Sequence, residues 1–439
     1  MTLIRPADWR SQGVDDLEPR AWEALRQTER SVLVTAGAGA GKTEFLAQKA
    51  TYLLQTGICR APKRILAISF KRDAARNLTE RVERRCPAEQ ARRFNSFTFD
   101  AFAKNLLDRF RLAVPEPFSP PANYRIVFPA RGDYEDFLGR HGHRGIQPGQ
   151  LEKGITRTKL PIDAGGGGLS GIVSEYWDAQ YNDYDEVPLS FSMINRLVEW
   201  LLRENPSIIK ALQLTYPVVF LDEYQDTTYA QFELLRRAFE DSDAVFTAVG
   251  DDKQRIMVWA GAMPDAFEKF EERIPLLSNW RSHEDLVRIQ HAIASRIDPD
   301  VEYPDARADR EVDGDVAAIW EFDDAEQENE VLARWVEHEV NINGIEPHEI
   351  AILVRVYANN VENALKPAFS DRALRLRNEA RIIEGISIQD LLGEELTALF
   401  MPLLRLGSTA RCPDAWTSAQ QRLQFVYAFD PADELGLQG

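Results

Sequence analysis

The sequence has few cysteines, no long apolar run and no apolar leader. Its three cysteines, Cys59, Cys86 and Cys412, lie far apart, which suggests neither a disulfide framework nor a zinc site. No uninterrupted apolar run reaches membrane length, and the opening residues MTLIRPADWRSQ lack the apolar stretch of a signal peptide. These absences predict a soluble protein with a cytoplasmic location and no membrane partner.

Positive charge is also scarce, because 52 Lys and Arg stand against 70 Asp and Glu and give a formal net charge of -18 at pH 7. Phosphate backbones are bound through basic surface, so this balance argues against a protein that simply coats nucleic acid. Residues 60–93 reverse the balance, with eleven Arg or Lys and four Asp or Glu. This segment is either a solvated helix face or a local patch for nucleic acid.

A glycine-rich stretch, TAGAGAGKTEFL, joins two predicted elements. Residues 31–36, SVLVTA, form a short β-branched run that predicts a central strand of a parallel sheet. After Gly41, apolar residues recur at helical spacing and stop at Gly57, a plausible C-terminal cap. A glycine-rich turn between a strand and a helix is typical of a phosphate-binding loop, although a chance lysine after such a turn is the alternative.

In such a loop, backbone N–H groups face phosphates at the positive end of the helix. We expect Lys42 to reach the β- and γ-phosphates of ATP and the Thr43 hydroxyl to hold Mg²⁺. The predicted loop residues are Ala36, Gly37, Ala38, Gly39, Ala40 and Gly41.

A second strand end supplies the acids that a nucleotide-hydrolysing site needs. In YPVVFLDEYQD, residues 218–221 are the predicted strand, and Asp222 and Glu223 follow at its carboxyl end, where open α/β sheets place ligands. Asp222 is suited to a Mg²⁺-linked role and Glu223 to orienting or deprotonating the attacking water. The pair favours hydrolysis over phosphotransfer by a small-molecule kinase, and two surface acids at a strand end are the alternative.

Two further strands, in RILAISF and VFTAVGDDKQ, end in polar residues at the same expected edge. Gln254 is a candidate for contacting the γ-phosphate and so reporting whether ATP or ADP is bound.

The motifs AGAGAGKT, SFKRDAA, TFDAFA, FLDEYQDT, VGDDKQRIMVWAGA and LSNWRSH occur in the order typical of the UvrD/Rep-like superfamily 1A helicases. The chain resembles that family over roughly residues 17–406. The resemblance implies an ATP-driven motor that uses Mg²⁺ and translocates on single-stranded DNA, typically 3′ to 5′.

The resemblance also assigns residues. It implies that Arg281 reaches the γ-phosphate from the far side of the cleft and that Trp280 stacks on adenine. The positions implied to lie along DNA are Phe70, Arg72, Thr98, Phe99 and Trp259. Core packing is the alternative for Trp280, Phe70 and Phe99.

The sequence departs from the family in two ways. Ala21 stands where the family has an adenine-reading Gln, and Asp73, Asp100, Met257 and Ala260 replace residues that grip DNA. The later motifs HxxKGLE and ALTRA are missing, and with them a second arginine for the γ-phosphate. We therefore expect an incomplete second RecA-like domain and weak turnover.

The expected fold class is α/β, a RecA-like P-loop NTPase core with a parallel sheet, a helical accessory insertion and an incomplete second RecA-like domain. A length of 439 residues predicts two or three domains. LSFSMINRLVEWLLRENP is the predicted helix that returns to the core, and VAAIWEF is a predicted strand. The predicted domains are 1–103 with 191–282 (1A), 104–190 (1B), 283–376 (part of 2A) and 377–439 (start of 2B).

Two functions from different classes fit these observations. The first is a UvrD-like helicase or translocase that couples ATP hydrolysis to movement on single-stranded DNA. The second is an ATP-binding, DNA-sensing regulatory subunit with a nuclease partner, resembling the helicase-like chains of anti-phage systems such as Gabija. Stimulation of ATP hydrolysis by single-stranded DNA distinguishes the two.

Overall fold

The computed structural model describes residues 3–143, 145–162, 167–258, 261–309, 312, 314–383, 386–387, 391, 395–409 and 411–427. The chain divides into two compact units, Met1–Ala317 and Ala318–Gly439. Among the described residues, no helix combines the length and the apolar character needed to cross a membrane.

The first unit is built on a six-stranded sheet with the order β3-β2-β6-β7-β1-β8. Every neighbouring pair in it is parallel, so all six strands end at the same edge. The predicted parallel sheet is therefore confirmed, with its first strand inside the sheet, next to the edge strand β8. The strands are β1 (Val32–Ala36), β2 (Ile65–Ser69), β3 (Phe94–Thr98), β6 (Val218–Leu221), β7 (Val245–Gly250) and β8 (Glu272–Leu276).

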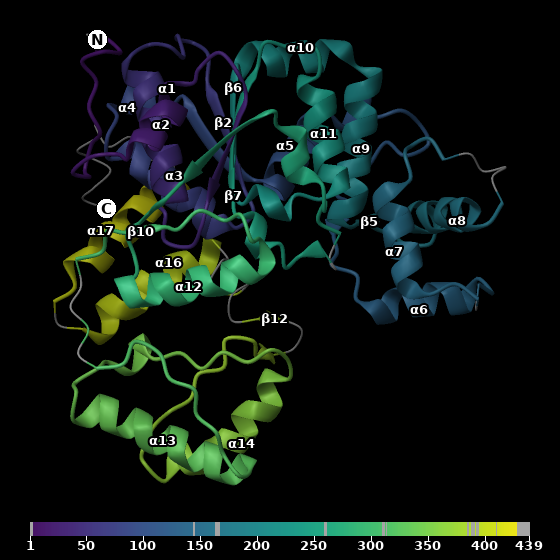
Figure 1. Ribbon diagram of the computed structural model, residues 1–439. Coiled ribbons are helices and arrows are strands. Elements are labelled where there is room, and N and C mark those ends of the chain that lie inside the picture. The colour runs from purple at the N-terminus through teal and green to yellow at the C-terminus, as the bar shows by residue number, and fades with distance from the viewer. Residues whose placement is uncertain are drawn as a thin grey trace. The chain divides into compact units, whose positions relative to one another are not determined.

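Helices cover both faces of this sheet because its strands alternate their apolar side chains between two cores. In β1, Val32 and Val34 belong to one hydrophobic cluster and Leu33 to the other. Figure 1 shows the two layers, with α1, α2 and α3 on one face and α5, α9 and α11 on the other. The first layer contains α1 (Pro19–Arg26), α2 (Lys42–Gln55) and α3 (Arg72–Glu83), and the second contains α5 (Phe99–Phe110), α9 (Phe191–Glu204) and α11 (Tyr229–Phe239).

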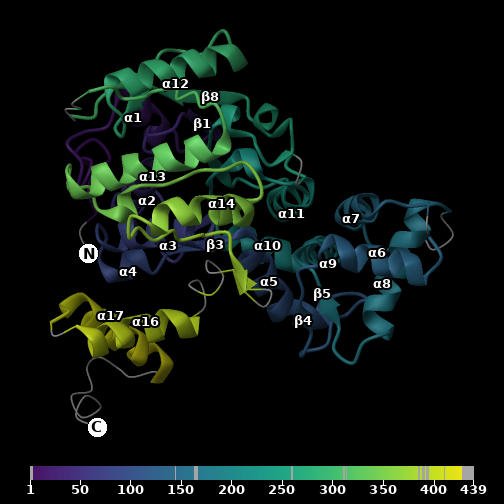
Figure 2. The ribbon, with the colours of Figure 1, turned by 90° about the horizontal axis from the view of Figure 1, so that it is seen from below.

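The predicted accessory insertion is largely helical. Its helices α6, α7 and α8 gather beside the short pair β4 and β5 (Figure 2). Trp177 of α8 is fully buried in the same hydrophobic cluster as residues of the sheet, so this region shares a core with the sheet. The elements are β4 (Arg125–Ile126), α6 (Arg131–Arg140), α7 (Pro148–Arg157), α8 (Leu169–Asn182) and β5 (Pro188–Leu189).

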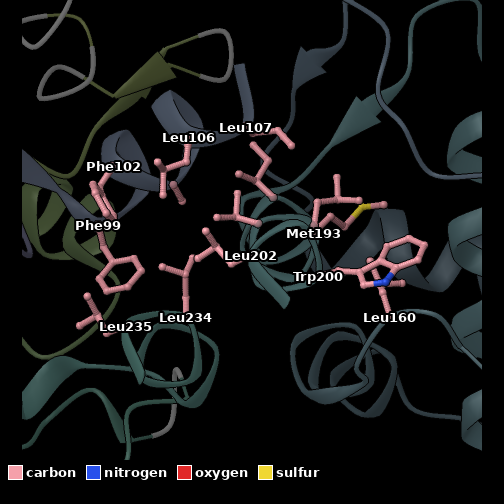
Figure 3. Packing of buried hydrophobic residues seen from close by; sticks show 14 of the residues in the cluster. Phe99, Phe102, Leu106, Leu107, Leu160, Met193, Trp200, Leu202, Leu234 and Leu235 are labelled. Atoms are coloured by element: carbon pink, nitrogen blue, oxygen red, sulfur yellow. The ribbon is translucent and has the colours of Figure 1, made fainter. Parts of the chain in front are cut away.

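Helix α9 is the returning helix that the sequence predicted. It begins at a side-chain cap, because the Ser190 hydroxyl accepts a hydrogen bond from the Met193 backbone N–H. Residues 193–202 are all buried, so the helix lies inside the unit instead of covering its surface. Figure 3 shows Leu202 between side chains of α5 and α11, while Met193 and Trp200 lie on the side of Leu160.

The rest of the first unit consists of short elements and one longer helix. Two of the short helical turns follow strand ends at the carboxyl edge of the sheet. The remaining elements are α4 (Ala88–Ala91), η1 (Arg111–Ala113), α10 (Pro206–Thr215), η2 (Tyr224–Asp226), η3 (Asp252–Gln254), η5 (Ala266–Lys269), β9 (Ser278–Asn279), α12 (Glu284–Ile297) and β10 (Asp305–Ala306).

The second unit is mainly helical. Its helices α13 and α14 enclose a small cluster made of Ala333, Val336, Leu365 and Phe369. Its elements are α13 (Ala325–Asn341), η6 (Pro347–Glu349), α14 (Ala358–Ser370), β11 (Ile382–Ile383), β12 (Ile386–Ser387), α16 (Glu395–Ser408) and α17 (Pro413–Tyr427). The four predicted domain boundaries stay predictions.

The strand predicted at residues 316–322 is wrong, because the structure assigns no strand there. An apolar, β-prone run becomes a strand when a neighbouring strand accepts its backbone hydrogen bonds. Within the described residues no strand pairs with this run, and Ile319 is 92% exposed.

Candidate functional site

The loop between β1 and α2 has the backbone conformation of a phosphate cradle. Gly39 and Gly41 have φ of +82° and +81°, a region that side chains other than glycine rarely adopt. A Cβ at Gly39 would lie 2.5 Å from Asn279 Oδ1, so glycine is also needed for close packing. Gly41 caps α2 without a side-chain hydrogen bond, which leaves the first-turn N–H groups to an anion.

The loop alanines take part through their backbones. The Ala40 N–H donates to the Gly37 carbonyl at 3.3 Å and closes the turn. The Ala36 carbonyl accepts from Lys42 Nζ at 3.3 Å, and the Ala38 carbonyl accepts from Asn279 Nδ2 at 3.0 Å. The whole predicted loop is therefore tied together and to a distant segment of the chain.

Lys42 connects this loop to the acids after β6. Its Nζ lies 3.8 Å from Glu223 Oε2, and its side chain is largely buried. The neighbouring Thr43 is half-buried in the first turn of α2. The structure thus brings together residues that are 181 positions apart (223 - 42) in the sequence.

Asp222 directly follows β6 and is 7% exposed. Its N–H donates to the Ile68 carbonyl at 2.8 Å, and its Oδ1 accepts from the Glu223 N–H at 3.0 Å. Burial, followed by the nearby Glu223 carboxylate, raises the pKa of Asp222 to about 6. A carboxylate kept from water in this way favours a cation as a partner.

A third acid, Asp226, bears on whether this site suits Mg²⁺. Asp226 has its Oδ1 buried without a hydrogen-bond partner. Burial and Glu223 also raise the pKa of Asp226. The Lys42 ammonium group acts on Asp222 and Asp226, and that of Lys71 also acts on Asp226. Among the described residues no three acids are arranged to hold a metal by themselves, which suits Mg²⁺, an ion usually bound through one or two carboxylates and the phosphates. Asp222 and Thr43 are the residues that would hold it.

Glu223 occupies a strained backbone position. Its φ is 49° and its ψ is 47°, in the left-handed region that costs a non-glycine residue free energy. Its Oε2 accepts a hydrogen bond from Gln225 Nε2 at 2.8 Å. Strain of this kind is retained where surrounding contacts fix the backbone.

Gln225 links this loop to the end of β7, a role that the sequence motifs did not predict. Its Oε1 accepts from the Asp251 N–H at 3.1 Å, and Asp251 Oδ2 accepts from Gln254 Nε2 at 2.7 Å. A continuous chain of contacts therefore runs from Lys42 through Glu223 to Gln254. The only sequence signal was the position of Gln225 inside DEYQD.

The segment after β9 lies directly on the glycine-rich loop. The Trp280 N–H donates to the Gly39 carbonyl at 3.0 Å. Asn279 Oδ1 accepts from the Arg281 and Ser282 N–H groups, both at 3.0 Å. Trp280 is 50% exposed, so it is available for stacking, and the Arg281 side chain is exposed. Asn279, which was not among the predicted site residues, fastens this segment to the loop.

The residues predicted along DNA lie in different environments. Phe70 is 40% exposed after β2, and Arg72 is exposed at the start of α3. The Thr98 hydroxyl caps α5 by accepting from the Ala101 N–H at 3.1 Å. Phe99 is 7% exposed and packs in the core (Figure 3). This is the core position that was the alternative to a DNA contact for Phe99. Trp259 lies outside the described residues.

Three of the eleven basic residues of segment 60–93 form ion pairs with nearby acids. Arg76 pairs with Asp73 at 2.8 Å and lies 4.0 Å from Glu80, both on its own helix. Arg81 and Arg85 pair with Glu44 of α2. Counting charges along the sequence therefore overstates the free positive surface of α3.

A parallel sheet whose first strand leads through a glycine-rich loop into a helix, with acids at the end of β6 on the same edge, defines an α/β, RecA-like P-loop protein. The family can be stated as well. The profile of the UvrD/REP helicase N-terminal domain matches residues 17–119 and 142–275. The chain belongs to the UvrD/REP helicase family.

Individual relatives agree with this family. The chain is 28% identical over 304 residues to the ATP-dependent DNA helicase PcrA of Bacillus subtilis (strain 168), covering 64% of this chain and 40% of that protein. It is 28% identical over 288 residues to the ATP-dependent DNA helicase Rep of Escherichia coli (strain K12), covering 61% of this chain and 41% of that protein. For the ATP-dependent DNA helicase PcrA of Leuconostoc citreum the identity is 27% over 286 residues, covering 62% of this chain and 38% of that protein. The chain thus spans about two fifths of the length of these relatives.

Proposed function

We propose that this chain binds ATP with Mg²⁺ at the glycine-rich loop and hydrolyses it in response to single-stranded DNA, as part of a UvrD-like translocase. The observation that carries the proposal is the continuous chain of contacts from Lys42 through Glu223, Gln225 and Asp251 to Gln254. It connects a phosphate-binding lysine, a candidate base and a candidate γ-phosphate sensor in one network. The names of the relatives, ATP-dependent DNA helicases, support the same reaction.

Each residue has a role in this proposal. Lys42 and the N–H groups of the loop neutralise the β- and γ-phosphates, and Thr43 with Asp222 holds Mg²⁺. Mg²⁺, when bound, offsets charge that develops on the phosphates. Glu223 orients and deprotonates the attacking water, and its hydrogen bond from Gln225 fixes the carboxylate.

The remaining residues connect hydrolysis to the ligands. Gln254 and Arg281 contact the γ-phosphate, and Trp280 stacks on the base. Phe70 and Arg72 at the carboxyl edge of β2 and the start of α3 contact single-stranded DNA, through stacking and through phosphate pairing. Polarity 3′ to 5′ and the domain names 1A, 1B, 2A and 2B belong to the same proposal.

The proposal is tested by ATP hydrolysis of the 439-residue chain with and without single-stranded DNA. We expect DNA to raise turnover, and Glu223→Gln to lower the DNA-stimulated rate by about 100-fold or more, because a positioned base contributes on that scale. Glu240→Gln, a matched change at an exposed acid that follows α11, is the control and keeps the wild-type rate.

Two results oppose the proposal in different ways. ATP hydrolysis that is equal with and without DNA, and equal in Glu223→Gln, would show that the motor assignment is wrong. ATP and DNA binding without stimulated hydrolysis would favour the DNA-sensing regulatory subunit.

A further inference from the structure

Two helices that begin near different parts of the candidate site are joined by one carboxylate. Glu44 lies in the first turn of α2, two residues after Lys42. Its carboxylate pairs with Arg81 and, at 2.7 Å, with Arg85 Nη2, both from the C-terminal end of the α3 region. All three side chains are mostly buried, so solvent screens these pairs less than it screens surface pairs.

The two helices start where the two ligands are proposed to bind. Helix α2 starts immediately after the glycine-rich loop, and α3 starts at Arg72, immediately after Phe70 and Lys71. Arg81 lies nine positions after Arg72 along the helix, about 14 Å at the rise of an α-helix. Ala75, Leu78 and Val82 anchor α3 by their burial, so it acts as one rigid element.

Further hydrogen bonds fix the Glu44 carboxylate and the Arg85 guanidinium group in place. Gln48 Nε2 donates to Glu44 Oε1 at 2.8 Å, and Arg85 Nε donates to the Gln12 carbonyl at 3.0 Å. Arg85 Nη1 is buried without a hydrogen-bond partner. Within the described residues, Glu44 is therefore the acid that pairs with both guanidinium groups.

We infer that Glu44 is a positioning residue that couples the two ligands: through Arg81 and Arg85 it fixes α3 relative to the nucleotide loop, so that nucleotide and single-stranded DNA alter each other's affinity. This inference rests on the proposed function, because it needs both ligands to bind. The coupling is reciprocal, since two sites linked through one equilibrium must affect each other equally.

The test measures the affinity of the full chain for a single-stranded oligonucleotide with and without a non-hydrolysable ATP analogue and Mg²⁺. The ratio of the two affinities is the coupling. We expect Glu44→Gln to reduce this ratio at least fivefold, at the lower end of typical coupling between sites. Arg81→Gln is expected to do the same, and the double variant is expected to lose no more than either single one.

Glu80→Gln is the matched control, because Glu80 lies on α3 and its ion pair is with Arg76 of the same helix. We expect this control to keep the wild-type ratio. Thermal unfolding of each variant separates a folded chain with lost coupling from an unfolded one, and Arg81→Gln serves if Glu44→Gln does not fold.

The outcomes are distinguishable. A coupled wild-type chain whose ratio is unchanged in Glu44→Gln and Arg81→Gln would overturn this inference and leave the proposed function intact. A wild-type chain that binds neither ligand would overturn both. A chain that binds both ligands without any effect of one on the other would overturn the inference alone.

Discussion

The two units of the chain differ in how their secondary structure is stabilised. In the first, strands and helices share two large hydrophobic clusters, which bury side chains from the sheet, from both helical layers and from the accessory insertion. In the described part of the second, the hydrophobic cluster is made of Ala333, Val336, Leu365 and Phe369 between α13 and α14. All the candidate site residues that the structure describes belong to the first unit.

This difference explains where precise geometry is found. Hydrogen bonds of 2.7–3.1 Å join Glu223, Gln225, Asp251 and Gln254 because the strands that precede them are held by a close-packed core. A unit with a small core holds side chains less firmly, since burial of apolar surface is the main driving force of folding.

The difference between the two hydrophobic cores can be tested by truncating one buried phenylalanine in each unit. Phe102 of α5 and Phe369 of α14 are both 3% exposed. Truncating a buried phenylalanine to alanine costs about 3–5 kcal/mol. We expect Phe369→Ala to unfold the second unit, and Phe102→Ala to lower the unfolding midpoint of the first unit while leaving it folded. Amide hydrogen exchange on the full chain reports each unit separately.

Equal tolerance of both substitutions would contradict this account of the two cores. Phe102→Ala also serves as a test of cooperativity. Because α5 shares its cluster with the accessory insertion, we expect exchange to rise in the insertion as well as in the sheet.

A second prediction uses the pH dependence of Asp222. Its pKa is raised from the ordinary value of 3.8 to about 6, mainly by burial. The folded state therefore binds more protons than the unfolded state between these values, so this group's contribution makes stability fall as pH rises through the window and stay low above it. Two pK units correspond to about 3 kcal/mol.

Asp222→Asn removes this penalty. We expect it to stabilise the nucleotide-free chain by about 1–3 kcal/mol at pH 8, with a smaller gain at pH 4, while ATP hydrolysis is lost. Chemical denaturation at the two pH values measures the difference. A gain in stability that is the same at both values would show that the buried charge is not its cause.

The smallest expected effect concerns backbone strain. Glu223 has a left-handed backbone conformation, and glycine adopts that region without steric cost. We expect Glu223→Gly to raise the free energy of unfolding by up to about 1 kcal/mol and to abolish hydrolysis. Asp241, with a φ of 56°, provides the control: Asp241→Gly gains similar stability and retains hydrolysis. If Glu223→Gly is destabilised while Asp241→Gly is not, relief of backbone strain does not govern the stability at position 223.

The sequence predicted the local elements of the site well. The strands that precede Phe70, Asp222 and Asp251 begin and end close to their predicted limits, because short apolar runs that end in polar residues mark buried parallel strands. The glycine-rich loop was predictable for the same reason: its chemistry is contiguous in the chain.

Contacts between distant residues could not be predicted in this way. The hydrogen bonds that Asn279 makes to the loop and the pairing of Arg81 and Arg85 with Glu44 depend on tertiary packing. The strand predicted at 316–322 failed because its apolar pattern does not specify a partner strand. Phe99 matched a position implied to face DNA, yet its side chain lies in the core.

The most direct test of the central claim is the rate of ATP hydrolysis, measured with saturating single-stranded DNA, for the wild-type chain and for Lys42→Ala. The proposed function predicts DNA-stimulated hydrolysis in the wild type and none above background in the variant, because the ammonium group beside Glu223 would no longer hold the phosphates. Wild-type hydrolysis by Lys42→Ala would contradict the assignment of the site.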